Sequence, residues 1–323
     1  MIDLHCHSTF SDGDKTPEEL VAMAREIGLA ALALTDHDTM AGLPRFFAAD
    51  GGGGADVARG FFEAGDIVLV GGCELSVEFG GRDAHMLCYG ADPVNGPLAA
   101  KLEEIRSERD RRNRKILARL NELGIGISWE DVVKHARDGV VGRPHFAAAM
   151  IEAGYAKDKY EVFDEWLGEG KKAHVEREHV SAAEAISLIH GAGGVAVLAH
   201  PHVLRLSRKN MATAADRLAA DGLDGLECHY SEHSAAQTRF YRSLAEARGM
   251  LVTGGSDYHG KNMPGVGLGR GFGGLRVPEE LLAPLLNIRC ISNFDHILQG
   301  RISHDINKSF CHKPLTPSLR SPH

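Results

Sequence analysis

The sequence lacks several features that would place the protein in a membrane or outside the cell. No apolar stretch approaches the roughly 18 residues that a spanning helix needs, which excludes such a helix. The first residues carry neither a cationic nor an apolar segment, so we expect no secretory signal and a cytoplasmic location. The six cysteines form no C-x-x-C pair and are expected to be reduced thiols.

Positive charge is also in short supply. The 323-residue chain has 36 Lys and Arg residues against 44 Asp and Glu residues, a formal net charge of −8 at pH 7. Non-specific nucleic-acid binding depends on a basic surface that neutralises phosphates, so this balance excludes a protein that coats nucleic acid. The length and ordinary composition are typical of an enzyme with one large α/β domain, with or without an insertion.

Short apolar segments alternate with helical segments along most of the chain. Seven strands are expected, at 2–4, 31–35, 67–74, 84–89, 195–198, 223–226 and 250–252. Helices are expected at 16–27, about 57–64, 182–190, 211–220 and 235–248. This alternation predicts a parallel α/β fold, either an open doubly wound sheet or a barrel.

The interval 97–180 breaks this alternation. It begins with a long charged helix, expected at 98–123, and contains no strand pattern. We therefore predict one α/β domain in two parts, 1–96 and 181–288, with a helical insertion at 97–180. The last segment, 289–323, has no Ala, Val or Glu and is expected to be a poorly packed tail.

Histidine is unusually abundant, with 18 residues that mostly lie in short clusters. His5 and His7 are two apart at the end of the first strand, so both side chains point to one face. Other histidines and carboxylates lie in, at the end of, or just after other strands. These candidate metal ligands are His5, His7, Asp12, His37, Glu74, His85, His200, Asp257 and His259.

A single histidine in an apolar strand, such as His85, is more often a packed core residue. Nine ligand-type residues with this placement favour metal binding, because active sites of (β/α) barrels are built at the carboxyl ends of the strands. One ion takes about four to six donors, so the set predicts two or three divalent ions. Zinc, manganese and iron all accept such ligands.

Five motifs together resemble those of the PHP (polymerase and histidinol phosphatase) phosphoesterases: His5-x-His7 with Asp12, Thr35-Asp36-His37-Asp38-Thr39, Glu74, Ala199-His200-Pro201 and Ser256-Asp257-x-His259. The resemblance covers about 1–90 and 181–288. It implies a distorted (β/α)7 barrel with a trinuclear metal site. It also implies three ligand groups: His5, His7, Glu74 and Asp257; Glu74, His85 and His200; and Asp12, His37 and His259.

The insertion resembles that of PHP proteins acting on nucleotides, including 3′,5′-nucleoside bisphosphate phosphatases and 5′→3′ exonucleases. The resemblance implies that the insertion is a substrate lid, with contacts from Arg111, Arg112, Asn113, Arg143 and His145. Most charges of the long helix also fit a solvated face with pairs one turn apart. Arg143 at a helix start suits phosphate oxygens, whereas His145 fits a buried position equally well.

The predicted function is hydrolysis of a nucleotide phosphate monoester: a 3′,5′-bisphosphate gives the 5′-monophosphate and phosphate, or a short oligonucleotide end is degraded. We expect a small phosphorylated substrate and no obligate protein partner. Because this hydrolysis is very slow without a catalyst, metal ions are expected to supply most of the acceleration. A metal-bridging hydroxide near Glu74 would attack phosphorus, and His229 would protonate the leaving oxygen. Asp36 and Asp38 are expected to orient His37.

Three alternatives stay open. Histidinol-phosphate phosphatase shares the metal ligands, although its small substrate does not need a nucleotide-sized lid. A metal-dependent amidohydrolase typically uses a ligating lysine, in the role that Glu74 would have here. A non-catalytic PHP module, like those within some DNA polymerases, would be expected to have lost ligands.

Overall fold

The computed structural model describes residues 1–49, 60–136, 140–176 and 180–287. Seven strands lie in the spatial order β1-β2-β4-β5-β7-β8-β9, and the short strands β3 and β6 pair with β4. The strands are β1 Ile2–Asp3, β2 Ala31–Leu34, β3 Phe61–Ala64, β4 Ile67–Glu78, β5 Asp83–Tyr89, β6 Val180–Ser181, β7 Val195–Leu198, β8 Gly225–Tyr230 and β9 Leu251–Gly255. The α-helices are α1 Pro17–Glu26, α2 Leu43–Ala48, α3 Gly96–Glu122, α4 Trp129–Ala136, α5 Arg143–Glu152, α6 Lys159–Val162, α7 Ala182–Gly191, α8 Arg208–Ala220, α9 Ala235–Glu246 and α10 Leu282–Asn287.

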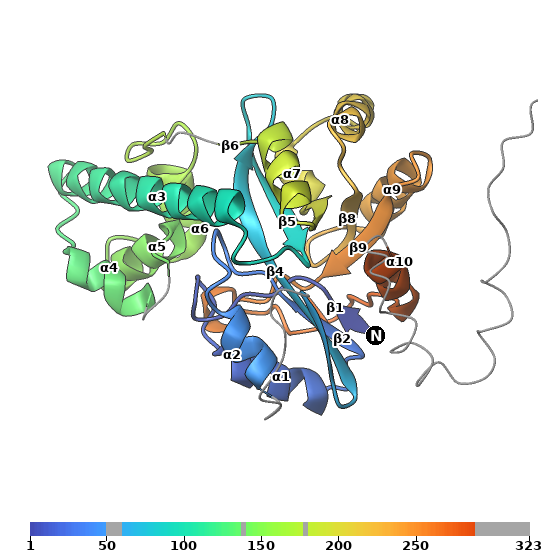
Figure 1. Ribbon diagram of the computed structural model, residues 1–323. Coiled ribbons are helices and arrows are strands. Elements are labelled where there is room, and N and C mark those ends of the chain that lie inside the picture. The colour runs from blue at the N-terminus through green and yellow to red at the C-terminus, as the bar shows by residue number, and fades with distance from the viewer. Residues whose placement is uncertain (50–59, 137–139, 177–179, 288–323) are drawn as a thin grey trace, which may run out of the picture.

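The two ends of this strand order meet. The Leu4 amide donates to the Gly254 carbonyl at 3.1 Å, and the Asp257 amide donates to the His5 carbonyl at 2.8 Å. The sheet therefore curls into a nearly closed barrel with helices around it (Figure 1). This confirms the predicted distorted (β/α)7 barrel.

The expectation of an all-parallel sheet is wrong at β5, which pairs antiparallel with both β4 and β7. No helix lies between β4 and β5, because the chain reverses at Gly80 and Gly81, with φ of 63° and 77°. Two successive positive φ angles suit the turn of a two-residue hairpin, which joins antiparallel strands only. The hairpin carries His85 back towards Glu74 on the neighbouring strand.

A second hairpin replaces the short helix expected at 57–64. Residues Phe61–Ala64 form β3, which pairs antiparallel with β4, so the helix prediction is wrong there. Residues 57–59 and the predicted tail at 289–323 lie outside the described residues.

The barrel and the insertion have separate hydrophobic clusters. One barrel cluster packs the strands against α1, α2, α7, α8, α9 and the beginning of α3, where Leu98, Leu102 and Ile105 take part. A second barrel cluster packs strand residues against α10. In the insertion, buried residues between Ile116 and Ala173 form a third cluster. Figure 1 shows α3, α4, α5 and α6 grouped to one side of the barrel. The boundaries 97–180 stay a prediction. The third cluster supports a separate insertion from Ile116 onwards, whereas the first turns of α3 pack with the barrel.

None of the helices within the described ranges combines the length and the apolar character that a membrane span requires.

Candidate metal centre

All nine predicted ligands converge at one end of the barrel. They come from β4 and β5 and from the segments that follow β1, β2, β7 and β9. Eight of them form three compact groups: His7, Asp12, His37 and His259; His5, His7, Glu74 and Asp257; and His37, Glu74 and His85. His200, expected beside Glu74 and His85, lies outside these groups, but its Nε2 is 2.8 Å from Glu74 Oε1. Within each group the ligand atoms lie within 4.8 Å of one another, close enough for one ion to contact them all.

The fully buried carboxylate of Glu74 lies at the middle of the cluster. Its Oε1 is 2.8 Å from both His85 Nδ1 and His200 Nε2. Its Oε2 is 3.0 Å from His37 Nδ1 and 3.3 Å from His5 Nε2. Burial would raise the pKa of the Glu74 carboxyl, but the imidazoles of His85 and His37 hold it well below its ordinary value. Glu74 is therefore an ionised carboxylate whose two oxygens face different groups of imidazoles.

A second buried carboxylate, that of Asp257, contacts His5 and His7. Its Oδ1 is 3.2 Å from His5 Nε2 and 3.0 Å from His7 Nε2. Burial would raise the pKa of Asp257, but His5 and His259 hold it well below its ordinary value. Burial would lower the pKa of His7, but hydrogen bonds to Asp257 and Glu74 raise it to about 10. Because imidazole binds metals in its neutral form, an ion would displace a proton from this site.

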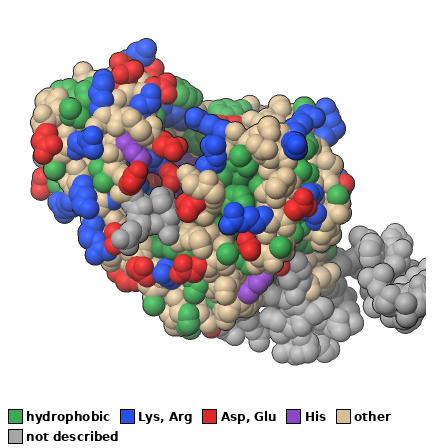
Figure 2. Space-filling model, turned by 90° about the horizontal axis from the view of Figure 1, so that it is seen from above, with side chains coloured by type: hydrophobic (Ala, Val, Ile, Leu, Met, Phe, Trp, Pro, Cys, Tyr) green, Lys and Arg blue, Asp and Glu red, His purple; other side chains and the backbone are tan. Residues whose placement is uncertain are grey.

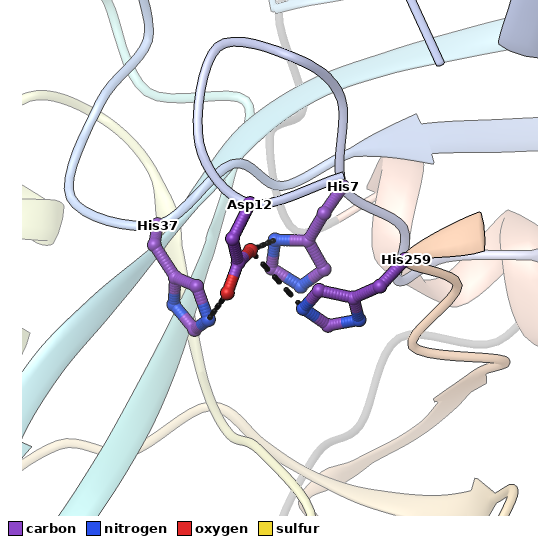
Figure 3. Close-up of side chains that lie close together, drawn as sticks. All are labelled: His7, Asp12, His37 and His259. Atoms are coloured by element: carbon purple, nitrogen blue, oxygen red, sulfur yellow. Dashed lines mark ion pairs between the residues drawn. The ribbon is translucent and has the colours of Figure 1, made fainter. Parts of the chain in front are cut away.

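The carboxylate of Asp12 lies among His7, His37 and His259, as Figure 3 shows. Its Oδ1 is 3.1 Å from His259 Nε2 and 3.8 Å from His7 Nδ1, and its Oδ2 is 3.7 Å from His37 Nε2. Burial lowers the pKa of His37 to about 3. Three imidazoles and one carboxylate therefore surround a single point.

The donor atoms fit divalent ions. Of the twelve buried side-chain atoms in the described residues that have no hydrogen bond of suitable geometry, five belong to the predicted ligands: His5 Nε2, Asp12 Oδ1, His37 Nδ1, Glu74 Oε2 and His200 Nδ1. Buried polar atoms without partners are costly and rare, so such a concentration calls for a ligand. Imidazole and carboxylate donors without thiolate suit zinc, manganese or iron.

A buried carboxylate that we did not predict supports these ligands from behind. Glu227, in β8, places Oε1 3.0 Å from His5 Nδ1, and its Oε2 accepts from the His200 amide at 2.7 Å. Carboxylates that bind the second nitrogen of a metal-ligating histidine fix its orientation. An acidic residue inside the apolar segment 223–228 was the available signal.

The two acidic residues expected to orient His37 have other partners. Asp36 accepts from the Ser8 hydroxyl at 2.7 Å, and Asp38 accepts from the Ser76 amide at 2.7 Å. Both therefore tie neighbouring segments together, and their role at His37 stays a prediction.

A cavity of about 580 Å³ opens beside the ligands, between the barrel and the insertion. Asp12, His37 and His85 line one part of it, and Arg109, Arg112 and Arg143 of the insertion line another. Figure 2 shows the surface hollowed between these two parts, with Lys and Arg side chains beside the hollow. The cavity thus joins the candidate metal centre to a wall that carries these three arginines together with acidic residues such as Asp83 and Glu169.

Only some of the predicted substrate residues line this cavity. Arg112 and Arg143 line it, whereas Arg111 is exposed and pairs with Glu108 on its own helix. Arg109 is a lining residue that we did not single out. It is buried and donates to the Asp38 carboxylate and, at 3.0 Å, to the Ser76 hydroxyl, so it connects α3 to the barrel.

Two further predicted substrate residues lie outside the cavity lining. Asn113 is fully buried and donates from Nδ2 to the Val141 carbonyl at 2.8 Å. His145 is buried, and its Nδ1 accepts from the Gly142 amide at 2.9 Å. Burial lowers the pKa of His145 to about 4. The contacts of both side chains hold the insertion together.

The structure does not bring His229 to the metal centre. In β8 the pairing register shifts between Glu227 and His229, which leaves one extra residue on this strand. Such a β-bulge re-aims the side chains that follow it. Burial lowers the pKa of His229, and its charged neighbours are Arg242 and Glu280. The general-acid role predicted for His229 therefore has no support in this geometry.

Known proteins resemble this chain in sequence and in structure. The family model of the PHP domain matches residues 3–219. The chain is 35% identical over 277 residues to a 3′,5′-nucleoside bisphosphate phosphatase of Chromobacterium violaceum, covering 84% of this chain and 90% of that protein. It is 34% identical over 257 residues to a 5′-3′ exoribonuclease of Haemophilus influenzae, covering 80% and 89%. A solved structure from Bifidobacterium adolescentis, assigned as a metal-dependent phosphoesterase, matches with a TM-score of 0.76 and 31% identity, covering 91% of this chain and 98% of its own.

Proposed function

The chain belongs to the PHP domain family and is a metal-dependent phosphoesterase, and from this premise we propose that it removes phosphate from a nucleotide. The proposed reaction converts a 3′,5′-nucleoside bisphosphate into the 5′-monophosphate and phosphate. The observation that carries this proposal is the cavity with metal ligands on one part of its wall and three arginines on another. A substrate with two phosphates matches both parts. The similarity to the Chromobacterium violaceum enzyme over most of both chains supports it.

The nine converging side chains are the proposed ligands of two or three divalent ions, manganese, zinc or iron. Glu74 would be shared between ions, because its Oε1 faces His85 and His200 while its Oε2 faces His37. When bound, such ions lower the pKa of water and neutralise the oxygens of the reacting phosphate.

The arginines of the insertion are the proposed binding groups for the second phosphate. Arg143 and Arg112 line the cavity, and a guanidinium can donate two parallel hydrogen bonds to a phosphate. Arg109 also lines the cavity, and its bonds to Asp38 and Ser76 of the barrel fix its position. The insertion would thereby orient the nucleotide and shield it from water.

A phosphate-release assay on the manganese-loaded protein, with and without chelator, tests this proposal. The substrates are adenosine 3′,5′-bisphosphate, AMP, histidinol phosphate and a short 5′-phosphorylated RNA. We expect chelator-sensitive release of the 3′-phosphate from the bisphosphate, at a higher kcat/KM than for AMP or histidinol phosphate.

The other outcomes replace the proposal with definite alternatives. Release of mononucleotides from the 5′ end of the RNA, in preference to phosphate from the bisphosphate, would make the protein an exoribonuclease. A preference for histidinol phosphate would overturn the role given to the insertion. No hydrolysis by protein with bound metal would contradict any action on these phosphate esters.

A further inference from the structure

Tyr230 contacts two proposed ligands that follow different strands. Its hydroxyl donates to Asp257 Oδ2 at 2.9 Å, and its ring centroid lies 5.2 Å from that of His200. The side chain is 6% exposed, so the hydroxyl bond forms in a buried environment. In the proposed ligand set, Asp257 belongs to the first ion and His200 to the second. Tyr230 is therefore placed to act on both.

Both of these ligands have unusual backbone conformations. His200 has a φ of 25° and Asp257 a φ of 56°, and positive φ is unfavourable for residues other than glycine. Such conformations persist when the surrounding contacts determine them, and they concentrate at functional sites. Tyr230 supplies one such contact to each residue.

The hydroxyl of Tyr230 also determines how Asp257 meets an ion. Asp257 Oδ1 faces His5 and His7, at 3.2 and 3.0 Å, while Oδ2 accepts from the phenol. With Oδ2 engaged, the carboxylate offers one oxygen to the cluster. A single well-oriented oxygen requires that the phenol stay in place.

The bulge in β8 explains why Tyr230 occupies this position. Glu227 pairs with Thr253, whereas His229 already pairs with Gly254, so the strand carries one extra residue. A Cβ on Gly254 would lie 2.4 Å from His229 Cβ, so this close pairing needs glycine. Beyond the bulge it is Tyr230, and not His229, that reaches the ligands.

We propose that Tyr230 is a positioning residue of the metal centre, which fixes Asp257 for one ion and supports His200 of the next. This inference rests on the proposed ligand set, and it is independent of which nucleotide is hydrolysed. Removing a hydrogen-bond partner of a metal ligand typically lowers metal affinity or activity about 10- to 100-fold.

The test compares Tyr230→Phe with Tyr241→Phe. The first variant removes only the hydroxyl that Asp257 accepts. The second removes a hydroxyl from a tyrosine that is equally buried, at 6% exposed. The ring of Tyr241 lies 4.8 Å from that of His233, and His233 is not a proposed ligand. Manganese affinity is measured by competition with a chelator of known affinity, with metal content read by plasma mass spectrometry. Urea unfolding of the metal-free proteins reports their folding separately.

We expect Tyr230→Phe to bind manganese about 10- to 100-fold more weakly than the wild type, and Tyr241→Phe to bind it as the wild type does. The metal-free proteins should unfold at similar urea concentrations. Unchanged manganese affinity in Tyr230→Phe would overturn the inference, even if its metal-free form were less stable, because the tyrosine would then be a packing residue only. If the wild-type protein bound no metal, the proposed ligand set would be wrong, and the role inferred for Tyr230 would be wrong as well.

Discussion

The barrel and the insertion build their halves of the site in different ways. On the barrel side, buried groups hold the ligands from behind: Glu227 behind His5, and Tyr230 behind Asp257. On the insertion side, Arg143 is 29% exposed and lies 3.6 Å from Asp83, which is itself half exposed. The barrel half is thus fixed by its own hydrogen bonds, whereas Arg143 of the insertion retains contact with water until a ligand binds. Changes in the barrel should therefore alter metal binding, and changes in the insertion should alter substrate binding.

Arg109 belongs to the insertion and yet behaves like the barrel residues, since it is buried against the Asp38 carboxylate. Replacing it by alanine leaves that carboxylate without its guanidinium. Breaking a buried ion pair from one side costs about 3–5 kcal/mol, so we expect Arg109→Ala to lower the free energy of unfolding by this amount. Urea unfolding measures it.

Arg111→Ala is the matched control, two residues along the same helix. Arg111 is exposed and pairs with Glu108, and exposed pairs contribute about 0–1 kcal/mol. Equal, small effects of the two substitutions would show that Arg109 does not join the insertion to the barrel.

Glu227→Gln tests how the barrel supports its ligands. His5 would lose its carboxylate partner while the shape of the side chain is kept. We expect manganese affinity to fall about 10- to 100-fold, measured by chelator competition. Glu232→Gln serves as control, because Glu232 contacts His202, which is not a proposed ligand, at 3.2 Å. The same loss in both variants would speak against support of His5 by Glu227.

The insertion should carry a pH dependence of its own, at His145. Burial lowers the pKa of His145 to about 4, whereas an imidazole in the unfolded chain titrates at about pH 6.5. Between these values the unfolded chain binds a proton that the folded protein does not, so stability is lost as the pH falls from 7 towards 4.

His145→Gln removes this titration and keeps an acceptor for the Gly142 amide at the helix start. From about pH 7 to pH 5 the variant should lose about 2 kcal/mol less stability than the wild type, as measured by urea unfolding. Metal loss at low pH affects both proteins alike. Equal losses would show that His145 is not held neutral in the folded protein.

Arg143→Ala should give the smallest effect. A partly exposed arginine that binds one phosphate contributes about tenfold to kcat/KM, and we expect the loss to appear in KM for the bisphosphate. Arg45→Ala is the control, since Arg45 pairs with Glu18 on the barrel surface. Manganese affinity should stay unchanged in both variants. A fall in kcat with KM unchanged would assign Arg143 to the chemical step.

The sequence predicted the barrel half well because its signals are local. His5-x-His7 needs only the alternation of a strand end to direct two imidazoles together, and the residues after the other strands follow from the barrel itself. The helix expected at 16–27 also begins where predicted, because its capping box joins Thr16 and Glu19, only three residues apart.

Two of the misses depend on contacts between distant segments. Whether His229 or Tyr230 faces the ligands depends on the register between β8 and β9, and nothing within β8 specifies the extra residue. Whether Arg109 is buried and Arg111 exposed depends on how α3 packs against the barrel. The Gly80-Gly81 turn was a local signal for the antiparallel β4–β5 pair that the strand–helix alternation obscured.

The central claim is that one carboxylate, Glu74, joins a multinuclear centre in the barrel. Counting metal ions per chain by plasma mass spectrometry tests it directly, for the manganese-loaded wild type and for Glu74→Gln, with the exposed Glu104→Gln as control. We expect two or three ions in the wild type and in the control, and the loss of more than one ion from Glu74→Gln. A wild type with one ion or none, or a Glu74→Gln variant that keeps every ion, would contradict it.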